Sequence, residues 1–241
     1  MFITLLVVSV SAALSTFLGG LFALRFKDRA HLIVGFSAGT VVGVAFFVFL
    51  SEALEIGGMY NTGSILSMAA LGFIVYLLID RFFHTHRDAE DHHDHEHTHR
   101  GVVRATSLSV HSFLDGIGIG LAFQVSSALG IVVTIAVLAH DFSDGINTVS
   151  AIVKGGGDRK RALKWLLVDS IAPVLGIFST LFFSVSDASL GLILSVFAGF
   201  FLYLGASDLV PESYHAHPTK WTTFATILGV VFIYLIIGFA G

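Results

Sequence analysis

The chain has 241 residues, of which 55% are hydrophobic and 12% are charged, and its formal net charge is −4. Soluble domains carry about 25% charged residues. With a mean hydropathy of +0.86, the composition excludes an ordinary soluble domain and indicates a membrane protein. The absence of cysteine excludes a disulfide framework and a thiolate metal site. The first apolar segment is long enough to span and follows no basic region, so we expect no cleavable signal peptide.

Eight apolar segments follow one another along the chain. Each approaches the ~20 residues that a helix needs to cross the hydrocarbon core. Their length and their lack of strict alternation favour helices over strands. We therefore predict an all-α polytopic protein with a single transmembrane domain over residues 1–241. The predicted spans are 2–24, 32–54, 63–83, 104–124, 129–153, 163–184, 189–210 and 221–240.

The basic residues lie at alternate links between these spans, and the other links have none. All 13 lysines and arginines fall at or beside the links after spans 1, 3, 5 and 7. Cytoplasmic loops of membrane proteins carry this excess of positive charge. The pattern predicts that these four links are cytoplasmic and that both termini lie outside, which fits an inner plasma membrane.

The link between spans 3 and 4 contains a histidine-rich tract, which we assign to residues 84–100. It has no core-forming residues, so we expect a disordered loop. Its imidazoles and carboxylates suit loose binding of borderline metals. The tract either serves metal buffering or regulation, or is a solvated loop that happens to chelate.

Spans 2 and 7 share a spacing. Gly39 precedes Glu52 by the same number of residues as Gly199 precedes Glu212. The two spans cross the membrane in opposite directions, so the repeat is inverted, as in many secondary transporters. We predict that spans 1–3 and 6–8 are related by this repeat around a central pair formed by spans 4 and 5.

Spans 4 and 5 each place a histidine four residues before an aspartate. Span 4 has His111 and Asp115, and span 5 has His140 and Asp144. Residues at this spacing share one helix face. Each aspartate costs about 2.5–3.5 kcal/mol at the centre of a membrane, so two matched pairs indicate a function.

The two pairs are expected to meet near the middle of the membrane. A short turn around Ser126 and Ser127 makes spans 4 and 5 antiparallel neighbours, and a rise of about 1.5 Å per residue brings both histidines to a similar depth. Two imidazoles and several carboxylates at one depth suit a divalent borderline metal. The candidate ligands are His111, Asp115, His140 and Asp144, followed by Asp141, Ser112, Asp169 and Asn147.

The last of these candidates have other interpretations. Asp169 lies inside span 6, four residues before Pro173, and either binds metal, pairs with Lys164 or closes a polar seam. Ser112 and Asn147 are equally compatible with a hydrogen bond to a neighbouring helix.

At these residues the chain resembles the ZIP (Zrt/Irt-like) family of metal-ion transporters, of the prokaryotic type. The family motif of span 4 is matched by His111, Ser112, Asp115 and Gly116, and that of span 5 by His140, Asp141 and Asp144. Residues 198–212 of span 7 resemble the family pattern that ends in Pro-Glu.

The resemblance implies transport of a divalent metal ion from outside to the cytoplasm. It implies a first metal position at His111, Asp115, His140 and Asp144. A second position would use Ser112, Asp115, Asp141, Asp144 and an acid from span 6. The chain departs from the family here, because Ala172 stands where many members have glutamate before the proline, and Asp169 lies one turn earlier.

We therefore expect a transporter for zinc, with Fe²⁺, Mn²⁺, Cd²⁺ and Co²⁺ as further possible substrates, and a homodimer. An intramembrane zinc hydrolase is a second interpretation, although HExxH is absent because Asp141 follows His140 and position 144 is aspartate. A metal-sensing membrane protein, with the histidine-rich tract as the sensor, is a third.

Overall fold

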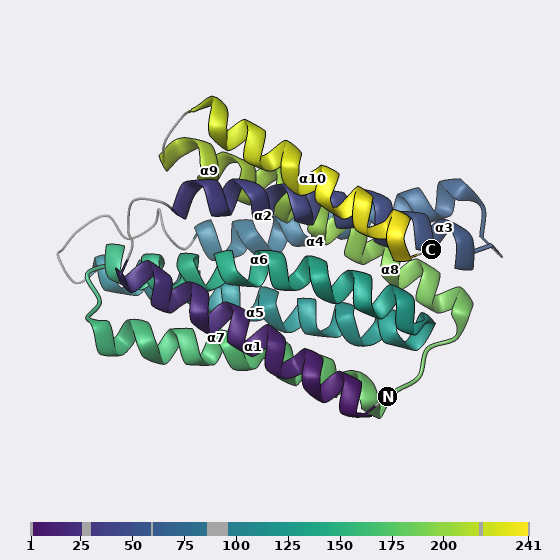
Figure 1. Cartoon of the computed structure of the whole chain (residues 1–241), viewed down its shortest axis with the longest axis horizontal. Coiled ribbons are helices and arrows are strands. Elements are labelled where there is room, and N and C mark those ends of the chain that lie inside the picture. Colours follow the sequence, from purple (N-terminus) through teal and green to yellow (C-terminus); the bar gives the residue numbers. More distant parts are fainter. Residues whose placement is uncertain (1, 26–29, 59, 86–95, 217–218, 241) are drawn as a thin grey trace.

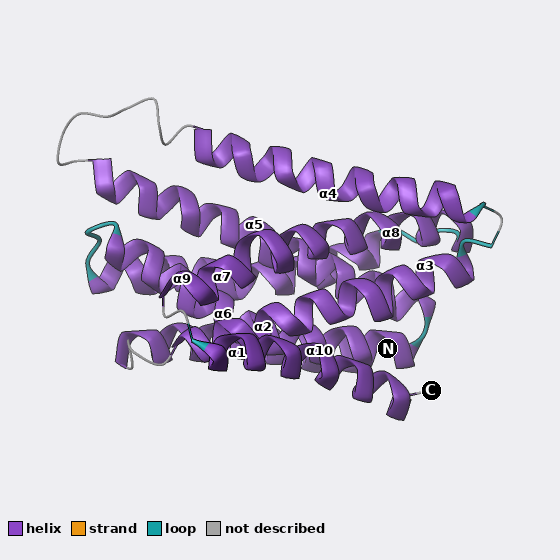
Figure 2. Cartoon of the chain, turned by 90° about the horizontal axis from the view of Figure 1, so that it is seen from above, coloured by secondary structure: helices purple, strands orange, loops and turns teal. Residues whose placement is uncertain are grey.

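The computed structural model describes residues 2–25, 30–58, 60–85, 96–216 and 219–240, and these are helical with short connections (Figure 2). Within these residues, eight helical segments are long and apolar enough to cross a membrane, and each boundary lies within four residues of its predicted position. The segments are Phe2–Arg25, Leu32–Ile56, Thr62–Phe82, Gly101–Val125, Ser127–Lys154, Arg159–Phe182, Ser189–Leu209 and Lys220–Phe239. The predicted all-α polytopic architecture is confirmed.

Six of the eight spans are built on one long α-helix each. The sixth span ends in η2, a 3₁₀ turn over Thr180–Phe182. The six helices are α1 (Phe2–Arg25), α4 (Thr62–Thr85), α5 (Glu96–Val125), α6 (Ser127–Lys154), α7 (Arg159–Ser179) and α10 (Lys220–Ala240).

Spans 2 and 7 are each made of three consecutive pieces. Span 2 comprises α2 (Ala30–Val44), a π-helical segment η1 (Ala45–Leu50) and α3 (Ser51–Ile56). Span 7 comprises α8 (Asp187–Tyr203), the π-helical segment η3 (Leu204–Leu209) and α9 (Val210–Ala216). π-Helical turns are rare and occur mostly at functional sites, and here they fall at corresponding places of the two spans that share the Gly-to-Glu spacing.

The pairing of helices follows the predicted inverted repeat. Helix α1 packs along α6 and α7 packs along α5, so span 1 pairs with span 5 as span 6 pairs with span 4. In the same way α2 packs along α10 and α8 along α4, so span 2 pairs with span 8 as span 7 pairs with span 3. Figure 1 shows α1, α5, α6 and α7 together in one half of the molecule, with α2, α9 and α10 in the other.

Reciprocal glycines bring the paired helices close together. A Cβ atom on Gly116 of α5 would lie 2.2 Å from the Pro173 carbonyl oxygen of α7, and one on Gly176 of α7 would lie 2.2 Å from the Phe113 carbonyl oxygen of α5. Small residues permit this approach of two backbones in membrane helices. Equivalent reciprocal contacts are made by Gly19 and Gly145 (α1 and α6), Gly39 and Gly229 (α2 and α10), and Gly72 and Gly199 (α4 and α8).

Helix α1 begins and α10 ends at the same end of the bundle, while α1 ends and α7 begins at the opposite end (Figure 1). The prediction of a disordered loop over 84–100 is wrong at both ends, because α4 extends to Thr85 and α5 begins at Glu96. Residues 86–95 between them lie outside the described residues.

Candidate metal centre

Helices α5 and α6 are antiparallel neighbours because one turn residue, Ser126, joins them. The backbone of Ser126 is extended, and its hydroxyl oxygen accepts a hydrogen bond from the Leu129 amide at 3.1 Å, which caps the start of α6. The predicted histidines lie near the middle of each helix, so the short turn brings the two His–Asp faces to the same depth.

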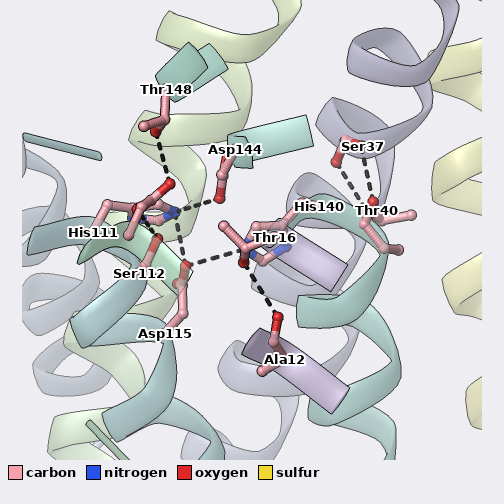
Figure 3. A network of polar contacts seen from close by, with 12 residues as sticks. Ala12, Thr16, Ser37, Thr40, His111, Ser112, Asp115, His140, Asp144 and Thr148 are labelled. Carbon is pink, nitrogen blue, oxygen red and sulfur yellow. Dashed lines mark hydrogen bonds and ion pairs between the residues drawn. The ribbon is translucent and has the colours of Figure 1, made fainter. Parts of the chain in front are cut away.

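The four residues of the two predicted pairs form one buried cluster (Figure 3). His111 is 4% exposed, and the other three side chains have no exposed surface. His111 Nε2 lies 3.0 Å from Asp115 Oδ2 and 3.9 Å from Asp144 Oδ2. His140 Nε2 lies 3.2 Å from the same oxygen of Asp115. One ligand atom from each of the four residues lies within 4.8 Å of all the others, and no second group of this kind occurs in the described part of the chain.

These spacings suit a single metal ion. Zinc bonds of about 2.0–2.2 Å to nitrogen or oxygen, arranged tetrahedrally, hold neighbouring ligand atoms about 3.3–3.6 Å apart. The nitrogen-to-oxygen distances of 3.0, 3.2 and 3.9 Å bracket this separation. Two imidazoles and two carboxylates also provide the mixed nitrogen and oxygen ligands that borderline divalent ions prefer.

The backbone of α6 selects the tautomer of His140. His140 Nδ1 lies 3.1 Å from the carbonyl oxygen of Ala136, which can only accept, so Nδ1 is the donor. A neutral imidazole then has no proton on Nε2, the atom that faces Asp115. This hydrogen bond on the opposite ring nitrogen is the usual way in which a metal-binding histidine is oriented.

Hydroxyl groups from two further helices hold α6 just before His140. Ser15 of α1 donates to the Leu138 carbonyl oxygen at 2.8 Å, and Ser37 of α2 donates to the Ala139 carbonyl oxygen at 2.9 Å. Sequence reasoning did not identify either serine. Their bonds attach the ligand-bearing segment of α6 to both halves of the molecule.

Buried polar atoms without a hydrogen-bond partner gather on the same stretch of α6. Neither carboxylate oxygen of Asp141 or of Asp144 has such a partner in the described part of the chain, and the same holds for Ser143 Oγ and Asn147 Nδ2. An unpaired charge in an apolar interior is strongly unfavourable. Since Asp144 belongs to the four-residue cluster, a bound cation would offset its charge directly.

The remaining sequence candidates lie beside the cluster rather than within it. Asp141 and Asn147 are buried on α6 but are not part of the group of four. Ser112 of α5 donates to Asp169 Oδ1 of α7 at 2.9 Å, which is a hydrogen bond to a neighbouring helix of the kind predicted as an alternative for Ser112. The other oxygen of Asp169 accepts from Thr148 of α6 at 2.7 Å.

Thr148 was missed by sequence reasoning. It lies four residues after Asp144, which places it on the same side of α6 as the acidic ligand. That spacing was a usable signal, but a threonine in an apolar helix is common and does not by itself indicate a site.

Aromatic rings from α8 and α4 cover the two imidazoles. The ring centroid of Phe201 lies 5.7 Å from that of His140 and 6.3 Å from that of His111. The Tyr76 ring lies 6.1 Å from the His111 ring, with its plane nearly perpendicular. Both aromatic residues are buried. One wall of the cluster therefore belongs to the helices that do not carry its ligands.

An eight-span helical bundle of this kind is an integral membrane protein, and the imidazoles and carboxylates clustered halfway along its two central helices are candidate metal ligands. Residues 85–240, more than half of the chain, match the family model described as ZIP Zinc transporter. The chain therefore belongs to the ZIP family, and the resemblance predicted from its motifs is confirmed.

Curated relatives carry names of the same kind. The chain is 30% identical over 117 residues to the zinc transporter ZIP4 of Homo sapiens, a match that covers 48% of this chain and 18% of the relative. It is 29% identical over 134 residues to zipt-7.2 of Caenorhabditis elegans, covering 52% and 29%. It is 26% identical over 253 residues to YKE4 of Saccharomyces cerevisiae, covering 90% and 72%. The chain thus spans less than a third of the first two relatives and most of the third.

Proposed function

We propose that this protein carries zinc ions across a membrane into the cytoplasm, and that His111, Asp115, His140 and Asp144 bind the ion on its way. The observation that carries the proposal is the buried group of four, whose ligand atoms lie within 4.8 Å of one another. Family membership and relatives named zinc transporters support the same conclusion.

The chemistry of the cluster favours a transition-metal dication. His140 Nε2 and Asp115 Oδ2 both present lone pairs toward the same space, which suits a cation placed between them. Zinc is the first candidate, since its preferred ligands are these residue types. Fe²⁺, Mn²⁺, Cd²⁺ and Co²⁺ are proposed as further substrates that the same nitrogen and oxygen ligands can accept.

The burial of the four ligands implies a transport cycle. Because they are between 0% and 4% exposed, an ion cannot enter or leave this arrangement without movement of the surrounding helices. Secondary transporters with inverted repeats open a midplane site to one side at a time by moving one part of the fold against another. Closure of the site by aromatic residues of the non-ligand helices is compatible with such a cycle.

The direction of transport is the one that the family resemblance implies, and the orientation of the protein in the membrane rests on the charge pattern. We propose that the links bearing lysine and arginine, including the histidine-rich tract, face the cytoplasm, and that both termini lie outside in the inner plasma membrane. The location of the α1 start and the α10 end at one end of the bundle supports this arrangement. The homodimer and the prokaryotic type of the family stay predictions, which the mass of the purified protein in nanodiscs and the family relationships of the chain would test.

The test is metal flux into proteoliposomes. Purified protein should take up zinc, and His111→Ala and Asp144→Ala should each abolish uptake while the proteins remain folded in the membrane. Asp158→Asn is the matched control, because this exposed aspartate lies away from the cluster and asparagine still caps the start of α7. Wild-type flux by both cluster variants would refute the proposal. A panel of divalent ions, with and without a proton gradient, would define the substrates and any proton coupling.

The same preparation separates the two other interpretations. An intramembrane hydrolase would cleave peptide or lipid substrates, whereas a transporter moves metal without cleavage. A sensor would lose its response when residues 84–99 are deleted, whereas a transporter should continue to carry zinc.

A further inference from the structure

Asp169 links three of the helices beside the metal cluster, α5, α6 and α7. It lies on α7, has no exposed surface, and uses both carboxylate oxygens. Oδ1 accepts a hydrogen bond from Ser112 of α5 at 2.9 Å, and Oδ2 accepts one from Thr148 of α6 at 2.7 Å. Each hydrogen bond therefore links α7 to one of the two helices that carry the ligands.

The two hydroxyl donors are placed directly beside ligands. Ser112 follows His111 in the chain and precedes Asp115 by three residues, while Thr148 lies one helical turn after Asp144. A shift of either helix along or around its axis would therefore break a bond to Asp169. Figure 3 shows Ser112 and Thr148 on the same side of the cluster as His111.

We propose that Asp169 is a positioning residue that holds α5 and α6 in register behind the metal cluster, and that the cluster binds one metal ion rather than two. This inference rests on the proposed function and concerns how the same site is built. It differs from the resemblance, which implies a second metal position with an acid from span 6 among its ligands.

The arrangement of acceptors supports a single ion. Asp169 is not among the residues whose ligand atoms lie within 4.8 Å of one another. No group of three or more histidines and acids that includes Asp169 has its ligand atoms this close together in the described part of the chain. Asp141, with two unpartnered oxygens, is the acid on which a second ion would have to depend.

The magnitude of the expected effect follows from other metal sites. Removal of a group that orients a metal ligand through a hydrogen bond typically weakens metal binding by about 10- to 100-fold. A ligand behaves differently, because its loss removes a bound ion or most of its affinity. The number of ions and the affinity therefore distinguish the two roles.

The experiment measures zinc stoichiometry and affinity on the purified full-length protein, together with the visible absorption of the Co²⁺ form. Wild type should bind one ion. Asp169→Asn keeps an acceptor for one hydroxyl and a donor for the other, so it should still bind one ion with an affinity within about tenfold of wild type. Asp169→Ala and the double variant Ser112→Ala/Thr148→Val should bind one ion about 10- to 100-fold more weakly, with altered Co²⁺ spectra.

Folding is controlled by a third variant. Ser112→Ala, Thr148→Val and Asp169→Leu combined remove the hydrogen bonds and leave no unsatisfied polar group, a replacement that is often close to neutral for stability. If it is monodisperse and helical but binds zinc as weakly as Asp169→Ala, loss of positioning is the cause.

Two results would overturn the inference. Two ions in wild type would overturn the single metal site, and one ion in Asp169→Asn would then make Asp169 a ligand. Wild-type affinity and an unchanged Co²⁺ spectrum in both Asp169→Ala and the triple variant would remove any role in positioning. Both readouts are binding measurements, so failure of the proposed transport would instead appear as a wild-type protein that binds zinc and does not move it.

Discussion

His140 Nε2 and Asp115 Oδ2 lie 3.2 Å apart, on two different helices, in the centre of an apolar bundle. The Nδ1 atom of His140 is the donor to the Ala136 carbonyl oxygen, so a neutral His140 and an ionised Asp115 face each other as two acceptors. Such a contact is unfavourable unless a cation or a proton lies between the two atoms. A cation bound between the two atoms would remove this repulsion.

Asp115→Asn should therefore reverse the order of stability with and without metal. In chelator, the new amide N–H can donate to His140 Nε2, so we expect the variant to be at least as stable as wild type, by up to about 1 kcal/mol. In zinc, wild type should be the more stable protein. Thermal unfolding followed by tryptophan fluorescence measures both conditions. A variant that is less stable in chelator and still gains the full stabilisation by zinc would contradict this account, and Asp158→Asn serves as the control.

Removal of metal should destabilise the wild-type protein. A ligand that binds only the folded state stabilises it by about 2.7 kcal/mol when its concentration is 100 times Kd. Zinc should raise the midpoint of thermal unfolding by several degrees, and a chelator should reverse the shift. His111→Ala should show no shift, because the imidazole that contacts both Asp115 and Asp144 is lost. An equal shift in this variant would place the stabilising ion elsewhere.

Gly116→Ala should destabilise the crossing of α5 and α7. A Cβ atom at this position would lie 2.2 Å from the Pro173 carbonyl oxygen. Overpacking of this kind typically costs about 1–3 kcal/mol, or roughly 2–4 °C in the unfolding midpoint for each kcal/mol in a chain of this size. Gly238→Ala is the matched control, since no atom lies within 4 Å of a Cβ atom there. Equal midpoints for the two variants would show that the helices separate easily at this crossing.

Phe201→Ala should damage both packing and metal binding. The Phe201 ring contacts the imidazoles of His140 and His111, and the side chain is 2% exposed. Truncation of a buried phenylalanine costs about 3–5 kcal/mol, and loss of the wall that orients the imidazoles should weaken zinc binding by about tenfold. Phe239→Ala, at a side chain that is 90% exposed on the surface of the bundle, should change neither. Unaltered zinc affinity in Phe201→Ala would show that the ring only fills space.

The prediction of the spans succeeded because it depends on local properties of the chain. An apolar segment of about 20 residues must form a helix in lipid, since its backbone hydrogen bonds have no other partners. The four-residue cluster was also predictable, because each His–Asp pair lies within one helix and a short turn at Ser126 forces the two helices together. The inverted repeat left a weaker signal in the sequence, namely two equal Gly-to-Glu spacings. This signal agrees with the matched helix pairs, in which span 1 packs on span 5 as span 6 packs on span 4, and span 2 packs on span 8 as span 7 packs on span 3.

The surroundings of the cluster were not predictable in the same way. Ser37, Phe201 and Tyr76 come from three different helices, and nothing in the chain near each residue indicates its distance from the histidines. Asp169 illustrates the limit. Its burial and acidity made it a candidate ligand, while the two hydroxyl groups that occupy its oxygens come from residues 57 and 21 positions away.

By itself the sequence determined that the protein spans a membrane eight times and that two His–Asp pairs share one depth, because hydrophobic length and helical periodicity are properties of consecutive residues. Only the tertiary structure decided which acids join the imidazoles and which acid is occupied by hydroxyl groups. The physical reason is that these contacts depend on helix pairs that approach through reciprocal glycines, and the register of such crossings is set by packing between distant segments.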